Sequence, residues 1–206
     1  MITIWGRANS INVQKVLWAL AEIDEPYERI DAGMQFGVNN TPEFLLMNPN
    51  GLVPVLKEGD FVLWESHAIL RYLARRDKTR CLLPASDQQI AHADQWLEWY
   101  SSTLWESMKP VFRGLVRTPP EQRNMAAINE GIAALAKNMT MLNKHLSKNA
   151  FVAGDSFSIG DIPLALVAHR WYLLDIERPT VPALDQWFKR VSARPAFQKD
   201  CAGPLS

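Results

Sequence analysis

Hydrophobic and polar positions alternate differently in the two parts of the chain. Over the first 76 residues, short apolar runs alternate with segments whose apolar residues recur every three to four positions, a pattern that indicates strands and helices in turn. The strand-like runs are "ITIW", "YERID", "VPVLK" and "FVLW", and the helical segments are "INVQKVLWALAEI", "TPEFLLM" and "ESHAILRYLARR". Only the turn "EGD" separates the last two strands, which predicts an antiparallel hairpin. The order βαβαββα predicts an α/β domain with a mixed sheet over residues 1–77.

From residue 86 onward, the apolar residues keep a helical period. The pattern continues along the rest of the chain and predicts an all-helical domain over residues 87–206. Between the two patterns, periodicity lapses and polar residues accumulate in "RDKTRCLLPASD". We therefore expect a linker at residues 78–86.

Three helix starts in the second domain have local signals. Each has Ser or Thr followed three residues later by a side chain that can reach back to free backbone N–H groups, as in a capping box. The pairs are Ser86 with Gln89, Thr118 with Glu121, and Ser158 with Asp161. Pro119 would occupy the first turn of the second of these helices. Residues 88–116 carry a long amphipathic pattern, in which Pro110 predicts a bend because it cannot donate a backbone hydrogen bond.

Composition narrows the classes of function. The 206 residues carry equal numbers of acidic and basic side chains, so no overall field favours nucleic acid or an anionic membrane. Cys81 and Cys201 lie far apart and near no histidine at metal-ligand spacing, which argues against a metal site and favours a reducing compartment. We find no secretion signal and no apolar run that could span a bilayer, so we expect a cytoplasmic protein.

Several common catalytic motifs are missing from the sequence. It has no G-x-G-x-x-G after the first strand, no P-loop, no G-x-S-x-G and no H-E-x-x-H, which excludes the enzymes that depend on them. The histidines receive no role, because a single histidine in a helical pattern is more often a surface or core residue than a catalyst. They are His67, His92, His145 and His169.

Three stretches together resemble the cytosolic glutathione transferases. "NPNGLVPVL" matches that family's N-P-x-G-x-V-P-x-L signature, "WESHAILRYL" matches its acidic-Ser-x-Ala-Ile helix start, and "FSIGDIPLA" matches the capping box of a buried helix in its second domain. The resemblance spans essentially the whole chain and is to a bacterial, serine-type branch of theta or delta character. It implies a thioredoxin-like first domain, a helical second domain that contributes the electrophile site, and a homodimer.

The resemblance implies how glutathione would be held. The Val53–Pro54 bond would be cis, and the main chain of Val53 would pair with the glutathione backbone. An X–Pro bond makes the cis form accessible at a cost of about 0.5–1 kcal/mol, although Pro54 alone also fits a trans proline on an edge strand. Ser66 would hold the γ-glutamyl carboxylate, with Glu65 facing the ammonium group. A helix N-terminus favours such an anion, but Glu65 and Ser66 could also simply cap the helix.

The glutathione thiol needs a group that stabilises its thiolate. A free thiol has a pKa of about 8.5, and lowering it by about two units requires roughly 2.7 kcal/mol. When the loop after the first strand is aligned with the serine-type branches of this family, which read S-x-P-C-R, Ser10 matches their active-site serine. Asn12 and Val13 stand in place of the proline and the cysteine. We expect Ser10 to donate a hydrogen bond to the sulfur. Asn12 is the alternative or helping donor, in which case Ser10 is only a helix cap.

The glycyl end of glutathione and the second substrate have weaker signals. Polar side chains that could hold the glycyl carboxylate are Gln35, Asn39 and Asn40. In the family, the electrophile lies between the thiol loop and the first long helix of the second domain. On that helix an apolar stripe could line the electrophile site or belong to the bundle core. It consists of Trp105, Met108 and Phe112.

A basic stripe lies on the same helix. Lys109, Arg113 and Arg117 follow one another at intervals of four residues, so they share one helix face. Such a stripe is usually solvated, but if it faces the cleft it would favour anionic electrophiles such as halogenated acids.

The expected function is conjugation of the glutathione thiolate to small electrophiles, in a cytoplasmic detoxification role. Glutathione would be a co-substrate, and no prosthetic group is expected. Two alternatives use the same scaffold: glutathione-dependent reduction of peroxides or disulfides, and a non-catalytic interaction module. The presence of Ser10, Asn12, Glu65 and Ser66 favours an enzyme over the module.

Overall fold

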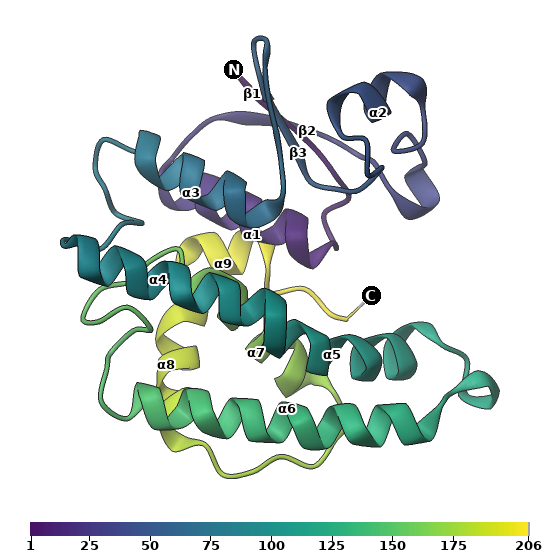
Figure 1. Ribbon diagram of the computed structural model, residues 1–206, viewed down its shortest axis with the longest axis vertical. Coiled ribbons are helices and arrows are strands. Elements are labelled where there is room, and N and C mark those ends of the chain that lie inside the picture. Colours follow the sequence, from purple (N-terminus) through teal and green to yellow (C-terminus); the bar gives the residue numbers. More distant parts are fainter. Residues whose placement is uncertain (206) are drawn as a thin grey trace.

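The first part of the chain forms a four-stranded mixed sheet covered by helices (Figure 1). The structure is a computed structural model in which residues 1–205 are described. The strand order is β2-β1-β3-β4, with β1 parallel to β2 and antiparallel to β3, and with β3 and β4 antiparallel. The elements are β1 (Ile2–Trp5), α1 (Ile11–Glu22), β2 (Tyr27–Ile30), η1 (Met34–Phe36), α2 (Pro42–Met47), β3 (Val55–Glu58), β4 (Phe61–Trp64) and α3 (Ser66–Arg76). The predicted βαβαββα order and mixed sheet are confirmed.

The two faces of the sheet pack against different helices. Ile2, Ile4 and Leu56 are fully buried in the main core, to which α1 and α3 also contribute. Val55 belongs instead to a smaller cluster around Phe44 of α2. Because side chains alternate between the faces of a strand, this arrangement places α2 on the face opposite α1 and α3 (Figure 1).

The second part of the chain is helical, as predicted. Its first long helical stretch continues through Pro110 and contains two π-helical turns, η2 and η3. The antiparallel helix α6 packs along this stretch. The elements are α4 (Asp87–Trp99), η2 (Tyr100–Leu104), α5 (Trp105–Phe112), η3 (Arg113–Arg117), η4 (Pro120–Gln122), α6 (Met125–Leu146), α7 (Asp161–Leu173), α8 (Pro182–Ser192) and α9 (Pro195–Asp200). No helix within residues 1–205 is long and apolar enough to cross a membrane.

Two of the three predicted helix starts are found. Ser86 and Gln89 form a complete capping box at the start of α4, and α7 begins at Asp161, whose carboxylate accepts bonds from the N–H and hydroxyl of Ser158. Asp161 also accepts bonds from the Val152 N–H at 3.1 Å and from Trp187 Nε1 at 2.8 Å. Although these donors favour the charged form, complete burial raises the pKa of Asp161 to about 6.

The predicted start at Thr118 is wrong. The Thr118 hydroxyl donates to the carbonyl of Arg113, and α6 begins later, where the Asn124 side chain accepts from the Ala127 N–H at 3.1 Å. Pro119 precedes a second proline, Pro120, and a residue in that position is pushed out of the helical region. Its ψ is 144°, so the chain makes only the short turn η4 before the long helix begins.

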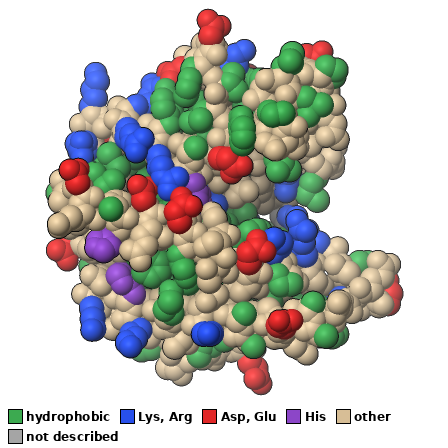
Figure 2. All heavy atoms as spheres, viewed as in Figure 1, with side chains coloured by type: hydrophobic (Ala, Val, Ile, Leu, Met, Phe, Trp, Pro, Cys, Tyr) green, Lys and Arg blue, Asp and Glu red, His purple; other side chains and the backbone are tan. Residues whose placement is uncertain are grey.

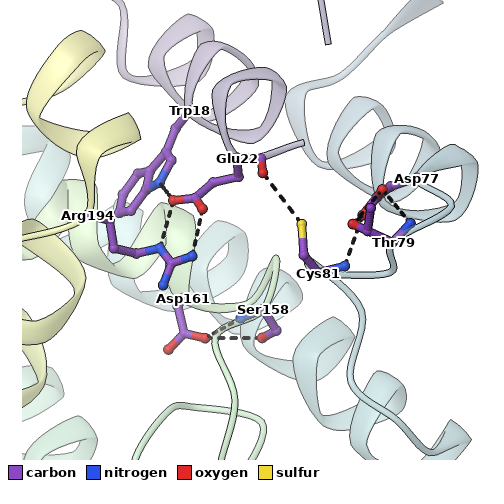
Figure 3. A network of polar contacts seen from close by, with 8 residues as sticks. All are labelled: Trp18, Glu22, Asp77, Thr79, Cys81, Ser158, Asp161 and Arg194. Carbon is purple, nitrogen blue, oxygen red and sulfur yellow. Dashed lines mark hydrogen bonds and ion pairs between the residues drawn. The ribbon is translucent and has the colours of Figure 1, made fainter. Parts of the chain in front are cut away.

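Helix α1 connects the two domains. Helices α7 and α9 pack on α1, and one hydrophobic core includes residues of both parts. Figure 3 shows a polar contact at this junction: the guanidinium of Arg194, just before α9, donates two hydrogen bonds of 2.7 and 2.6 Å to the carboxylate of Glu22 at the end of α1. Trp18 Nε1 donates a third bond to Glu22 at 2.8 Å. In the segment between α3 and α4, Cys81 Sγ contacts the Glu22 carbonyl at 3.6 Å.

Candidate functional site

A cleft between the two domains contains three adjoining cavities. The Ser66 cavity, of about 420 Å³, lies between the start of α3 and the end of α4. The Ser10 cavity, of about 280 Å³, lies between the start of α1 and α5. The Asn39 cavity, of about 430 Å³, lies beside the loop before α2. Asn12 lines the first two cavities and Val53 the last two. Figure 2 shows the molecule hollowed between its two domains, with Lys and Arg side chains at the margin.

The start of α3 forms one wall of the Ser66 cavity. Ser66 is its first residue, so free backbone N–H groups lie there. Ser66 is 6% exposed, and its hydroxyl lies 3.5 Å from Asn12 Oδ1. Glu65 occupies the N-cap position with a φ of +71°, and its side chain does not cap the helix. A positive φ is unfavourable for a residue other than glycine and is common at functional sites. The structure therefore brings the predicted residues Asn12, Glu65 and Ser66 together.

Ser10 lies at the start of α1 and lines the Ser10 cavity. It occupies the N-cap position, but its side chain accepts no capping hydrogen bond. A serine at this position normally uses its oxygen for the free N–H groups of the first turn. The Ser10 hydroxyl is thus not committed to its own helix. Asn12, the alternative donor, also lines this cavity.

The loop before β3 lines the other side of the cleft. The Val53–Pro54 peptide bond is cis, as predicted, and Val53 lines the Ser10 and Asn39 cavities. Asn39 also lines the Asn39 cavity, and its amide donates to the Gly51 carbonyl at 2.7 Å. Asn40 is exposed and does not line any of the three cavities. Of the two asparagines, only Asn39 is therefore placed to meet a ligand in the cleft.

The Ser66 cavity also contains a buried lysine that is not among the predicted site residues. Lys15 is 1% exposed, and its Nζ contacts Asn12 Oδ1 at 3.0 Å, His67 Nε2 at 3.0 Å and Ser66 Oγ at 3.4 Å. The Nζ also lies over the ring of Tyr100, 3.8 Å from its centroid. Burial lowers the pKa of Lys15 well below its usual value, and the charge of Arg170 acts in the same direction. The only signal in the sequence was the Asn12–Lys15 spacing of three, which places both on one face of a helix.

His67, to which the sequence assigned no role, is part of the same cavity. It is 9% exposed, and burial together with the charges of Lys15 and Arg71 lowers its pKa to about 2. The ring is therefore neutral, and its Nε2 faces Lys15 Nζ at 3.0 Å. The Ser101 hydroxyl donates to the Leu97 carbonyl at 3.4 Å, so its oxygen accepts from the ring and Nε2 accepts from Lys15. This leaves the proton on Nδ1, which lies 3.3 Å from Ser101 Oγ.

The predicted apolar stripe divides between the cleft and the core. Trp105 and Phe112 line the Ser10 cavity. Met108 is fully buried in the hydrophobic core and does not line any of the three cavities, so its assignment to the electrophile site is wrong. At roughly 100° per residue, Met108 lies about 60° from Trp105 around the helix, on the side away from Arg113. That side faces the bundle.

The predicted basic stripe divides in the same way. Arg113 and Arg117 line both the Ser10 and the Asn39 cavities. Lys109 does not line either cavity and forms an ion pair with Glu106 at 2.6 Å. The structure adds Arg7, from the loop before α1, and Arg170, from α7. Among the described residues that line the Ser10 cavity, four are arginines and none is a carboxylate.

These arginines lie close enough to affect one another. Burial lowers the pKa of Arg7 and of Arg117, and a neighbouring arginine lowers each further. Burial lowers the pKa of Arg170 to about 10. Arg117 and Arg170 lie over the ring of Phe112, with their guanidinium carbons 5.1 and 5.4 Å from its centroid. The Ser10 cavity thus has a positive wall that an anion would stabilise. Within residues 1–205, no three His, Cys, Asp or Glu side chains form a candidate metal site.

The fold and this cleft are those of the glutathione S-transferases. The family model for the glutathione S-transferase N-terminal domain matches residues 1–75, and the model for the C-terminal domain matches residues 105–195. The chain belongs to this family, as the resemblance of the sequence implied.

Named relatives and solved structures agree with this assignment. The chain is 41% identical to glutathione S-transferase GstB of Escherichia coli (strain K12) over 100% of both chains. It is 34% identical to glutathione S-transferase 3 of Zea mays, over 98% of this chain and 93% of the relative. The theta class glutathione S-transferase of Xanthomonas axonopodis pv. citri, solved with glutathione bound, is 39% identical. That structure has a TM-score of 0.95 and covers 100% of this chain and 99% of its own.

Proposed function

We propose that this chain is a glutathione transferase that binds glutathione along the cleft and directs its thiolate at an anionic electrophile. The γ-glutamyl group would occupy the Ser66 cavity, where the start of α3 offers free N–H groups and Glu65 lies beside it. The cysteinyl main chain would pair with Val53, and the glycyl end would lie in the Asn39 cavity. This path follows the order in which the three cavities adjoin.

The observation that carries the proposal is the uncommitted hydroxyl of Ser10. It lies in the cavity between the γ-glutamyl site and the arginines, and it does not cap α1. A hydroxyl donor near a helix N-terminus stabilises a thiolate over a thiol. Ser10 would therefore lower the pKa of the bound thiol, with Asn12 as a second donor. Catalysis would consist of this pKa shift together with positioning of the electrophile.

Ultraviolet titration of the bound glutathione thiolate tests this role. We expect Ser10→Ala to raise the pKa of the bound thiol by one to two units, about 1.4–2.7 kcal/mol, and Asn12→Ala to raise it less. Ser102→Ala, an exposed serine on η2, serves as the control. An unchanged pKa in both Ser10→Ala and Asn12→Ala would rule out hydrogen-bond activation, and a larger effect from Asn12→Ala would make Asn12 the main donor.

The arginine wall supports an anionic second substrate. Arg7, Arg113, Arg117 and Arg170 surround the space that faces Ser10, and Trp105 and Phe112 give it an apolar side. The positive charges of these arginines would attract a small electrophile that carries a carboxylate. Halogenated acids are of this class.

Two alternative functions, a glutathione-dependent reductase and a non-catalytic interaction module, can be distinguished by the products formed from glutathione. A reductase would consume peroxides or disulfides and release glutathione disulfide without forming a conjugate. An interaction module would bind glutathione, or nothing in the cleft, and show neither activity. The additional cavity for a second substrate favours conjugation.

The proposal also includes the location, the oligomeric state and the cellular role of the enzyme. We expect a cytoplasmic homodimer with a detoxification role. Exposed apolar side chains on α2, β4 and the loop before β3 support a second copy as partner: Leu45, Leu46, Leu52, Phe61 and Trp64. Sedimentation equilibrium of the purified chain tests the dimer, and a monomer at micromolar concentration would contradict it.

A further inference from the structure

Lys15 is a buried amine that forms no ion pair with a described residue. Its Nζ is surrounded by Asn12 Oδ1, His67 Nε2 and Ser66 Oγ, one acceptor for each N–H of an ammonium group. All three acceptors are neutral. A buried charge is costly unless it is paired, so the fold holds this amine in a position that stability alone does not favour.

Lys15 lies in the cleft, where its amine could interact with an anionic group of a ligand. Lys15 lines the Ser66 cavity together with Asn12, Ser66 and Glu65. It lies one turn into α1 from Asn12 and beside the start of α3, whose partial positive charge already favours an anion. The buried amine, the Glu65 carboxylate whose charge raises the pKa of that amine, and the free helix N-terminus therefore meet in one cavity.

Lys15 also determines which way its neighbours donate. An ammonium has donors only, so the Asn12 oxygen that accepts from it must be the carbonyl end of the amide. The Asn12 NH₂ group then points away from Lys15. In the same way, Ser66 Oγ accepts from Lys15 at 3.4 Å, so its O–H is a donor, which faces Asn12 Oδ1 across a long contact of 3.5 Å and can turn to a ligand. His67 is the third acceptor around Lys15, because its neutral ring accepts a hydrogen bond from the Lys15 amine at Nε2.

We infer that Lys15 is a positioning residue of the glutathione site, which directs the donors of Asn12 and Ser66 toward the ligand and provides the counter-charge for the α-carboxylate of the γ-glutamyl group. This inference rests on the proposed function. A bound carboxylate favours the ammonium form of a nearby lysine, so binding of the ligand and protonation of Lys15 support each other.

A pair of ligands that differ only in the α-carboxylate tests the inference. Isothermal titration calorimetry would give the Kd of glutathione and of γ-aminobutyryl-cysteinylglycine, which lacks that group but keeps the thiol. We expect the wild type to bind glutathione at least tenfold more tightly than the analogue. Lys15→Met keeps the length and packing of the side chain, and we expect it to reduce this preference at least fivefold. Lys78→Met, which removes an exposed lysine, should keep the wild-type preference.

A second variant covers the case in which Lys15→Met does not fold. Asn12→Asp places a carboxylate beside Lys15, so it supplies an internal counter-charge and competes with the ligand. We expect this variant to fold and to show the same loss of preference, because both ligands carry the thiol and any effect on the thiol cancels. A wild-type preference in a folded Lys15→Met, or in Asn12→Asp, would make Lys15 a structural residue only. If the wild type bound no glutathione at all, the proposed function itself would fail.

Discussion

Arg113 and Arg117 can bind an anion because of the surfaces that they face. Both lie on the helix face that lines the Ser10 and Asn39 cavities, whereas Lys109 of the same stripe pairs with Glu106. An exposed ion pair contributes little energy. Partly buried arginines that lie near one another raise the affinity for an anion.

Removal of an arginine should therefore change selectivity between charged and neutral electrophiles. We expect Arg113→Met to lower kcat/KM for 4-chloro-3-nitrobenzoate by about tenfold, or about 1.4 kcal/mol. The loss for 4-chloro-3-nitrobenzamide, which reacts at the same kind of carbon without the charge, should be less than about threefold. Steady-state conjugation assays measure both, and Lys109→Met is the matched control.

Other results of this assay would change the assignment. Equal losses for both substrates would contradict an anion site. A higher KM for glutathione alone would instead place Arg113 at the glycyl carboxylate, which would lie in the neighbouring Asn39 cavity.

The start of α7 is held by a buried carboxylate. Asp161 is fully buried and accepts hydrogen bonds from the backbone of Val152, from Ser158 and from Trp187. One carboxylate thus joins the start of α7 to the preceding loop at Val152 and to Trp187 of α8. The capping signal identified Ser158 and Asp161, but it gave no indication of Val152 and Trp187.

Loss of this carboxylate should destabilise the whole helical domain. Asp161→Ala leaves several buried donors without an acceptor, each at a cost of about 1–3 kcal/mol. We expect the free energy of unfolding to fall by about 3–5 kcal/mol in urea at pH 7.5. Asp155→Ala removes an exposed carboxylate nearby and should change it by less than about 0.5 kcal/mol. A loss below about 1 kcal/mol for Asp161→Ala would contradict the role of this network.

At the scale of the whole molecule, the two domains share one core and are joined by charged contacts, among them Arg71 of α3 with Asp94 and Glu98 of α4, and Glu22 with Arg194. Figure 3 shows Arg194 and Trp18 meeting on the carboxylate of Glu22, whose side chain is 8% exposed. The Arg194 guanidinium also lies over the ring of Phe157, 4.1 Å from its centroid. This junction therefore joins the end of α1 to the segment before α9.

Breaking the Glu22–Arg194 pair should cost more than breaking a surface pair. Arg194→Met leaves the Glu22 carboxylate largely buried with one remaining donor, so we expect a loss of about 1–3 kcal/mol in the free energy of unfolding. Addition of Glu22→Gln should recover part of it, which a double-mutant cycle in urea measures. Lys109→Met, which breaks the exposed pair with Glu106, should cost about 0–0.5 kcal/mol. Additive losses at Glu22 and Arg194 would contradict the coupling.

The sequence by itself determined the elements of both domains and part of the site. Helix and strand periods and capping residues depend on neighbours in the chain, so they predicted the mixed sheet and the helical domain. The cis bond at Pro54 and the candidates Ser10 and Ser66 came from the resemblance of short stretches such as "NPNGLVPVL" and "ESHAI" to the family. The failure at Thr118 was also local, because the effect of Pro120 on the residue before it outweighed the capping signal.

Only the tertiary structure decided which side chains share the cleft. Arg170 and Gln14 are 156 residues apart and are joined by a hydrogen bond of 3.0 Å, and Lys15 meets His67 across two helices. Met108 and Trp105 belong to one predicted stripe, yet one is in the core and the other in the cleft. The physical reason is that a cavity wall forms where separate elements pack, and the packing of α1 against α3, α7 and α9 is a property of the whole core. Periodicity shows that a face is apolar or basic, and the folded chain determines what that face meets.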